Sequence, residues 1–236
     1  MNKNDKMLKE VIDLINRMKS TRPLVECLTN RVTINDCANM LLAMGASPIM
    51  AEIECEMEEI MNISGALVIN LGLLDGTYLS AMKTASKAAK RLGKPIVLDP
   101  VGAGASKLRD ETCREMIELT RPDIIRGNMS EIRALTGGNI NSKGVDASDD
   151  DAVNESNRLE LGELVRGYAE KTESVVCATG ALDIVSDGVQ VFYLQNGHEM
   201  LCDVTGTGCM CSAMTGAMAA SGEPLAAAIA AVVMMG

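Results

Sequence analysis

The sequence Ala66-Leu-Val-Ile-Asn-Leu71 begins the stretch of chain that decides the fold. Two similar runs follow it, Pro95-Ile-Val-Leu-Asp99 and Asp123-Ile-Ile-Arg126. Short apolar runs rich in Val and Ile predict buried strands, and the segments between them, 78–92 and 107–119, have apolar residues at helical spacing. Strands that alternate with helices predict a mainly parallel sheet with helices on both faces, and therefore an α/β fold.

The rhythm changes after this stretch. We expect close-set strands at 175–178, 183–186 and 189–194, joined by turns at Thr179-Gly180 and Asp187-Gly188. Strands this close in the chain, with Gly in the turns, predict an antiparallel edge to the sheet.

The chain is predicted to be helical from Thr207 to its end, with a break at 221–224. Its most apolar tract, 225–235, is shorter than the roughly 18 to 20 residues that span a bilayer. The chain stops inside this apolar pattern at Gly236, so either the helix packs as a terminus or the chain has been cut. We expect a single domain over 1–236.

Composition excludes several classes of protein. The chain has 236 residues, of which 47% are hydrophobic, enough for one sizeable core. A net charge of −10 argues against binding to nucleic acid or to anionic membranes, because both require a positive field. Eight scattered cysteines and one histidine, without a signal peptide or paired Cys-x-x-Cys spacing, predict reduced thiols in a cytoplasmic protein.

Several familiar sites are missing from the sequence. It contains no Gly-x-x-x-x-Gly-Lys-Ser/Thr motif and no complete dinucleotide fingerprint. The single histidine, His198, is expected in a turn, so a Ser-His-Asp triad is not indicated. Residues 138–163 are polar and acidic and predict a solvated loop, in which Asp149-Asp150-Asp151 caps a helix that runs towards Lys171.

A glycine-rich turn with a cysteine precedes the small-residue helix near the C-terminus, in Asp203-Val-Thr-Gly-Thr-Gly-Cys209. Backbone N–H groups at a helix N-terminus attract anions, and Gly206 and Gly208 let that backbone come close to a ligand. The same position is expected to lower the pKa of the Cys209 thiol, so that Cys209 acts as a base or nucleophile. The turn therefore predicts an anion site with a reactive thiol.

Polar residues that follow the predicted strands are further candidates, because ligands of parallel sheets collect beyond the carboxyl ends of the strands. Asp99 is a candidate magnesium ligand, with help from Glu131, and Arg126 is a candidate phosphate clamp. Each has a structural alternative: Asp99 as a turn cap before proline, Glu131 as a helix first-turn acid, and Arg126 as a salt-bridge partner.

Seven segments in one order show a resemblance to a known family, the hydroxyethylthiazole kinases of the ribokinase-like superfamily. They are Leu28-Thr-Asn30, Asn39–Met50, Ser64–Asn70, Asp99–Gly104, Arg126–Glu131, Gly144–Ser148 and Val204–Cys209. The resemblance implies a three-layer α/β/α subunit that uses ATP and Mg²⁺ to phosphorylate the primary alcohol of 4-methyl-5-(2-hydroxyethyl)thiazole in thiamin salvage. It also implies a homotrimer, with the thiazole pocket at the subunit interface.

The resemblance assigns roles to individual residues. Cys209 occupies the place of the catalytic Asp of superfamily relatives, and the backbone from Gly206 through Gly208 to Cys209 would form the anion hole. On the substrate side it implies contacts from Met50, Gly206, Asn30 and Val32. On the nucleotide side it implies that Arg126 and Thr179 hold ATP, and that Asp99, Asn128 and Glu131 organise Mg²⁺ and its waters.

Some features leave alternatives open. Glu26 stands where many relatives have His, and Arg31 and Asp36 add charge nearby, so the reaction type is better indicated than the substrate. The same fold would also suit an ATP-dependent NAD(P)H-hydrate dehydratase, or a protein that binds a nucleotide or thiazole without catalysis. Thiol redox chemistry through Cys209 and Cys211 is disfavoured, because their spacing is not Cys-x-x-Cys and they lie on different sides of a helix.

Overall fold

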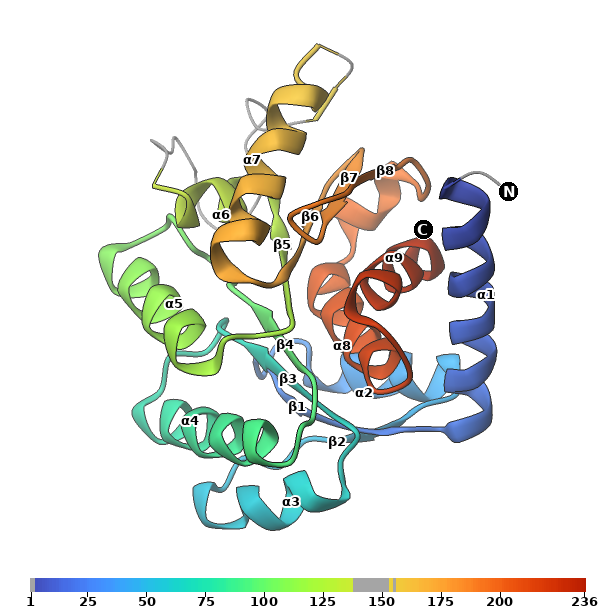
Figure 1. Ribbon diagram of the computed structural model, residues 1–236. Helices are drawn as coiled ribbons and strands as arrows, with labels where there is room; N and C mark the ends of the chain where they lie inside the picture. The colour runs from blue at the N-terminus through green and yellow to red at the C-terminus, as the bar shows by residue number, and fades with distance from the viewer. Residues whose placement is uncertain (1–2, 138–152, 155) are drawn as a thin grey trace.

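The computed structural model describes residues 3–137, 153–154 and 156–236 (Figure 1). Within them an eight-stranded sheet has the order β2-β1-β3-β4-β5-β6-β7-β8. The strands are β1 (Leu24–Leu28), β2 (Ser47–Ile49), β3 (Ala66–Asn70), β4 (Ile96–Asp99), β5 (Ile124–Asn128), β6 (Val175–Thr179), β7 (Asp183–Ser186) and β8 (Val191–Leu194). Strands β1 to β6 pair in parallel, whereas β7 and β8 pair antiparallel. The predicted α/β class and antiparallel edge are confirmed.

Helices cover both faces of the sheet (Figure 1). One side carries α1 (Lys3–Thr21), α2 (Ile34–Met44), α8 (Thr207–Ala219) and α9 (Pro224–Met235). The other carries α3 (Met57–Ile63), α4 (Gly76–Arg91), α5 (Lys107–Thr120), α6 (Met129–Leu135) and α7 (Arg158–Thr172). Two short 3-10 helices, η1 (Glu54–Glu56) and η3 (Glu199–Asp203), lie in connections. The molecule thus has the expected three-layer α/β/α architecture of the ribokinase-like fold.

The strand sequences are apolar throughout because side chains alternate between two buried faces. On β3, Val68 belongs to the core cluster on the α8 side, whereas Leu67 and Ile69 belong to the cluster on the α4 side. Helix α8 comes very close to the sheet: a Cβ on Gly216 would lie 2.3 Å from Val68 Cγ2. This close packing brings the N-terminus of α8 to the carboxyl ends of the strands.

The element boundaries differ from the expectations where side chains cap the backbone. Helix α4 begins at Gly76 rather than residue 78, because the Asp75 carboxylate accepts hydrogen bonds from the Thr77 and Tyr78 amides. Strand β8 begins at Val191 rather than residue 189, because the Asp187 carboxylate accepts hydrogen bonds from the Val189 and Gln190 amides and keeps them in the turn.

The acidic stretch is only partly within the described residues. The helix that was expected to run towards Lys171 is α7, and it begins at Arg158. Its proposed cap, Asp149–Asp151, lies outside the described residues, as do the rest of 138–152 and residue 155. His198, which was expected in a turn, is the N-cap of η3 with an extended backbone, and its Nδ1 accepts a hydrogen bond from the Met200 amide at 3.2 Å.

The apolar C-terminal tract forms α9, whose residues 226–232 are buried against the core. In the part of the chain that the structure describes, no helix combines the length and apolar character needed to cross a membrane.

Candidate active site

The N-terminus of α8 presents backbone donors at the carboxyl end of the sheet. Gly206 caps the helix in a left-handed conformation, with φ of 87°. The first hydrogen bond of the helix runs from the Met210 amide to the Gly206 carbonyl at 2.8 Å. The amides of residues 207–209 therefore have no partner within the helix, which is the arrangement that binds anions at helix N-termini.

Both glycines of this turn are in close contact with side chains of other elements. A Cβ on Gly206 would lie 2.3 Å from Thr33 Cγ2, and one on Gly208 would lie 2.7 Å from Arg126 Nη1. The need for glycine was predicted from the approach of a ligand. In the structure, the first reason for glycine is that the Thr33 and Arg126 side chains leave no room for a Cβ.

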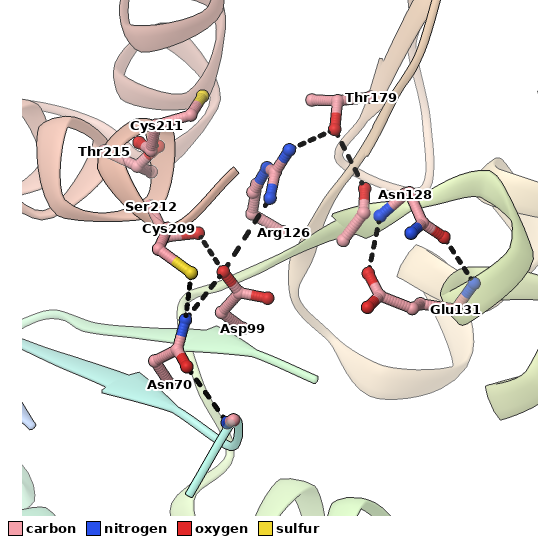
Figure 2. A network of polar contacts seen from close by, with 12 residues as sticks. Asn70, Asp99, Arg126, Asn128, Glu131, Thr179, Cys209, Cys211, Ser212 and Thr215 are labelled. Atoms are coloured by element: carbon pink, nitrogen blue, oxygen red, sulfur yellow. Dashed lines mark hydrogen bonds and ion pairs between the residues drawn. The ribbon is translucent and has the colours of Figure 1, made fainter. Parts of the chain in front are cut away.

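Asp99, the last residue of β4, lies at the centre of a polar network (Figure 2). Its Oδ2 accepts hydrogen bonds from Ser212 Oγ at 2.7 Å and Asn70 Nδ2 at 3.2 Å, and lies 3.7 Å from Arg126 Nη1. Its Oδ1 is buried and has no hydrogen-bond partner among the described residues. Burial raises the pKa of the Asp99 carboxyl, and the charge of Arg126 and the two hydrogen bonds oppose that shift.

Arg126 lies between Asp99 and Thr179 (Figure 2). Its guanidinium donates a hydrogen bond to the Thr179 hydroxyl, and that hydroxyl donates to the Gly127 carbonyl at 3.3 Å. Arg126 is buried, and within the part of the chain that the structure describes its Nε has no hydrogen-bond partner. The salt bridge to Asp99, which was the structural alternative for Arg126, is present. The guanidinium still has N–H donors available for a phosphate oxygen.

Asn128 and Glu131 form a capping box at the start of α6. Asn128 Oδ1 accepts from the Glu131 amide, and Glu131 Oε2 accepts from the Asn128 amide, both at 2.8 Å. Glu131 Oε1 also accepts from the Gly102 amide at 2.9 Å. Burial, followed by the nearby Asp99 charge, raises the pKa of Glu131 to about 7. Both residues thus have a structural role, and their contribution to nucleotide or Mg²⁺ binding stays a prediction.

The acidic side chains do not form a closed metal cage. Among the described residues, no group of three or more His, Cys, Asp and Glu side chains is placed to hold a metal ion. Asp99 has a buried oxygen without a partner, which fits a cation held by few protein ligands. Such a donor set suits Mg²⁺, which retains waters and phosphate oxygens in its coordination shell.

Cys209 lies beside this network, in the first turn of α8. Its Sγ accepts hydrogen bonds from Asn70 Nδ2 at 3.2 Å and from Asn30 Nδ2 at 3.3 Å. The expectation of a lowered thiol pKa is wrong: burial and the nearby Asp99 charge raise the pKa of Cys209. Cys209 is therefore a thiol at neutral pH. All eight cysteines are free, and Cys211 is buried with its sulfur directed away from that of Cys209 (Figure 2).

Two further predicted substrate residues, Met50 and Val32, follow the carboxyl ends of β2 and β1. Met50 follows β2 and packs, half-buried, against the core on the α8 side. Val32 is 76% exposed, and its amide donates to Asn30 Oδ1 at 3.1 Å. Glu26 is fully buried in β1, where its Oε2 accepts a hydrogen bond from the Ala51 amide at 3.5 Å and no described residue donates to its Oε1. Burial raises the pKa of Glu26 to about 8.

Two residues of the network, Asn70 and Ser212, were not predicted as site residues. A signal for Asn70 was available, because it is a polar residue that ends an otherwise apolar strand. Ser212 lies three positions after Cys209 and therefore on the same side of α8. Its small size made it resemble the other small residues that pack this helix on the sheet.

Comparisons with known proteins match nearly the whole chain to one family. The profile of the hydroxyethylthiazole kinase family matches residues 15–236. Hydroxyethylthiazole kinase from Clostridium beijerinckii is 45% identical, over 94% of this chain and 80% of that protein.

Solved structures of two enzyme classes have this fold, and they differ in how similar they are to this chain. The hydroxyethylthiazole kinase of Pyrococcus horikoshii OT3 has a TM-score of 0.85 and 44% identity, covering 95% of this chain and 82% of its own. An ADP/ATP-dependent NAD(P)H-hydrate dehydratase from Bacillus subtilis has a TM-score of 0.57 and 13% identity, over 92% of this chain and 80% of its own. The dehydratase shares only the fold, whereas both sequence and architecture agree with the kinases. The chain belongs to the hydroxyethylthiazole kinase family.

Proposed function

We propose that this kinase transfers the γ-phosphoryl group of ATP to the primary hydroxyl of 4-methyl-5-(2-hydroxyethyl)thiazole, a reaction of thiamin salvage. The observation that carries the proposal is the juxtaposition at α8: amides of residues 207–209 without partners within the helix, with Cys209, Asp99 and Arg126 around them. Membership of the family supports the substrate class.

The acceptor alcohol would bind on the Cys209 side of the α8 N-terminus. Met50 and Gly206 would contact the thiazole ring, with Asn30 and Val32 at its edge. Cys209 would place the hydroxyl in line with the γ-phosphorus. Asn30 donates a hydrogen bond to Cys209 Sγ, so the β1–α2 connection and α8 meet at the place proposed for the alcohol.

The nucleotide would bind on the Arg126 side. Arg126 and Thr179 would hold the phosphates, and Gly208 lets the guanidinium lie against the turn. Asp99 and Glu131 would hold Mg²⁺ directly or through water, with Asn128 fixing the position of Glu131. Bound Mg²⁺ would neutralise charge on the transferring phosphates.

The transfer is a single in-line displacement. The hydroxyl oxygen forms a bond to the γ-phosphorus, the bond to the β,γ-bridging oxygen breaks, and ADP leaves with that electron pair. The amides of residues 207–209 and the Arg126 guanidinium stabilise charge on the γ-phosphoryl oxygens. Because the transition state is loose and Cys209 is a protonated thiol, the hydroxyl proton is lost late, to water or to an oxygen of the transferred phosphoryl group, and Cys209 acts chiefly by orienting the hydroxyl.

We further propose that the protein works as a cytoplasmic homotrimer with the thiazole site at the subunit interface. Exposed apolar side chains support this, since Val32, Met200 and Val204 are 76%, 64% and 53% exposed in segments that flank Asn30 or Gly206. Sedimentation equilibrium should give three times the mass of the chain, and a monomer with full activity would contradict the proposal.

One experiment tests the reaction. The protein is incubated with Mg²⁺ and ATP against a panel of small primary alcohols that includes the hydroxyethylthiazole, and products are identified by mass spectrometry. Phosphorylated thiazole with one equivalent of ADP is expected. Turnover of hydrated NADH in place of the alcohols would favour the dehydratase. Calorimetry that detects binding without turnover would favour a non-catalytic binding protein.

A further inference from the structure

Asn70 lies between Cys209, on the acceptor side of the proposed site, and Asp99, on the phosphoryl-donor side. It ends β3, and its register partner on β4 is Asp99. Val68 and Val97, two residues earlier on each strand, belong to the core cluster on the α8 side. Because strand side chains alternate with a period of two, Asn70 and Asp99 point to that same side, towards the N-terminus of α8.

The orientation of the Asn70 amide is fixed by a backbone donor. Its Oδ1 accepts a hydrogen bond from the Gly72 amide at 2.9 Å, and a backbone N–H can only donate. The Nδ2 end must therefore point the other way. It supplies two N–H donors, and it lies 3.2 Å from both Asp99 Oδ2 and Cys209 Sγ (Figure 2).

Asn30 supports this arrangement from the β1–α2 connection. Its Oδ1 accepts from the Thr33 amide at 3.2 Å, which fixes the direction of its own amide. Its Nδ2 lies 3.3 Å from both Asn70 Oδ1 and Cys209 Sγ. The sulfur is thus held by two amides, but only Asn70 also contacts the carboxylate on the phosphate side.

We propose that Asn70 is a positioning residue that links Cys209 to Asp99, so that the group that orients the acceptor hydroxyl and the carboxylate on the phosphoryl-donor side keep a fixed separation. This inference rests on the proposed function. Asn70 is 1% exposed and acts through these two side chains. In-line transfer requires the acceptor oxygen and the phosphorus to be aligned, so a change in that separation lowers the rate of transfer more than it weakens binding.

Steady-state kinetics of Asn70→Ala and Asn70→Asp test the link. We expect kcat to fall about 10- to 100-fold in both variants, the size of loss seen when residues that orient site groups are removed. KM for the thiazole alcohol and for ATP should change less than about threefold. Asn70→Asp keeps the size of the side chain and the Gly72 bond, so it excludes a cavity as the cause. It leaves at most one donor in place of two, because a carboxyl beside Asp99 donates only when it is protonated. A rise in KM with unchanged kcat would overturn the proposal.

A double-mutant cycle with Cys209→Ala distinguishes positioning from general support of the fold. If Asn70 works by linking Cys209 to Asp99, then adding Asn70→Ala to Cys209→Ala should lower kcat by less than about threefold more. Losses that multiply would contradict the link. Asn62→Ala is the matched control, because this exposed asparagine donates only to the Glu58 carbonyl and should leave kcat unchanged.

A crystal structure of Asn70→Ala gives a readout independent of turnover. Cys209 Sγ should move relative to the Asp99 carboxylate, and an unchanged position would overturn the inference. If the wild-type protein phosphorylates no alcohol while this displacement is seen, the proposed function fails and the structural link stands.

Discussion

The Ser212 hydroxyl donates a 2.7 Å hydrogen bond to the Asp99 carboxylate across 113 residues of sequence. Both side chains are almost completely buried. The bond joins α8 to the end of β4 one helical turn after Cys209. It therefore fixes the position of the anion-binding turn, along the axis of α8, relative to Asp99. The site therefore depends on a contact that holds the helix in register with the sheet.

Replacing Ser212 by Ala should destabilise the protein. A hydrogen bond to a charged group contributes about 1.5–3 kcal/mol, and its loss leaves the buried carboxylate with one donor fewer. We expect the free energy of unfolding to fall by that amount in urea denaturation. Ser86→Ala is the matched control, since this buried hydroxyl donates only to the Met82 carbonyl within its own helix and should cost about 1 kcal/mol or less. Equal losses in the two variants would contradict this interpretation.

Gly208→Ala should impair catalysis without unfolding the protein. The new Cβ would lie 2.7 Å from Arg126 Nη1, so the end of the arginine side chain must move. We expect kcat/KM for ATP to fall about tenfold or more, because displacement of a positioned group by about 1 Å can cost two orders of magnitude. Thermal unfolding should change little, because Ala is the better helix former.

Gly167→Ala provides the comparison for this variant, because a Cβ at Gly167, in the middle of α7, would meet nothing within 4 Å. It should leave kcat/KM unchanged. Full activity in Gly208→Ala would show that the position of Arg126 does not limit the reaction.

Cys209→Ala should lower kcat about 100-fold, because the acceptor hydroxyl loses the group that orients it. Cys209→Asp should stay within about tenfold of the wild type, because carboxylate oxygens accept the same N–H donors of Asn30 and Asn70. Product formation by mass spectrometry measures both. Cys55→Ala, which removes an exposed thiol outside the proposed site and interface, should have no effect. An Ala variant at position 209 with wild-type turnover would rule out the role of this residue.

Glu26 should make stability depend on pH. Burial, with a smaller contribution from the Glu56 charge, raises its pKa to about 8, so the folded state holds a proton that the unfolded state releases near pH 4.5. The contribution of Glu26 to the free energy of unfolding is therefore fully present below about pH 4.5. It is lost as the pH rises through 8, by an amount on the order of 5 kcal/mol.

Glu26→Gln should remove this dependence, because the amide cannot ionise. The difference in unfolding free energy between the variant and the wild type, measured by urea denaturation from pH 5 to pH 9, should grow with pH. Taking the difference cancels the titration of Glu131 and Asp183, whose pKa values burial also raises. The exposed Glu59→Gln should give a difference that stays flat, and a flat curve for Glu26→Gln would refute the assignment.

The periodicity of the sequence predicted much of the architecture. Apolar runs at 66–71, 95–99 and 123–126 are strands β3, β4 and β5, and the close-set pair at the end of the sheet is antiparallel. These features depend on local pattern and turn chemistry. The first strand, β1, was not predicted from periodicity, because the buried Glu26 interrupts its apolar run with a residue that is normally exposed.

The sequence by itself determined which residue types stand at the carboxyl ends of the strands and at the start of α8. Asp99, Arg126 and Cys209 were identified in this way, because position after a strand or before a helix is a local property. Only the tertiary structure decided how they are connected. The bonds to Asp99 from Asn70 and Ser212 depend on the register of β3 against β4 and on the packing of α8.

The tertiary structure also decided the charge state of the thiol. A helix N-terminus alone favours a thiolate, whereas burial next to the Asp99 carboxylate raises the pKa of Cys209. Desolvation depends on the atoms that surround a group in three dimensions, and these come from segments far apart in the chain. The local pattern therefore located the thiol, and long-range packing set its chemistry.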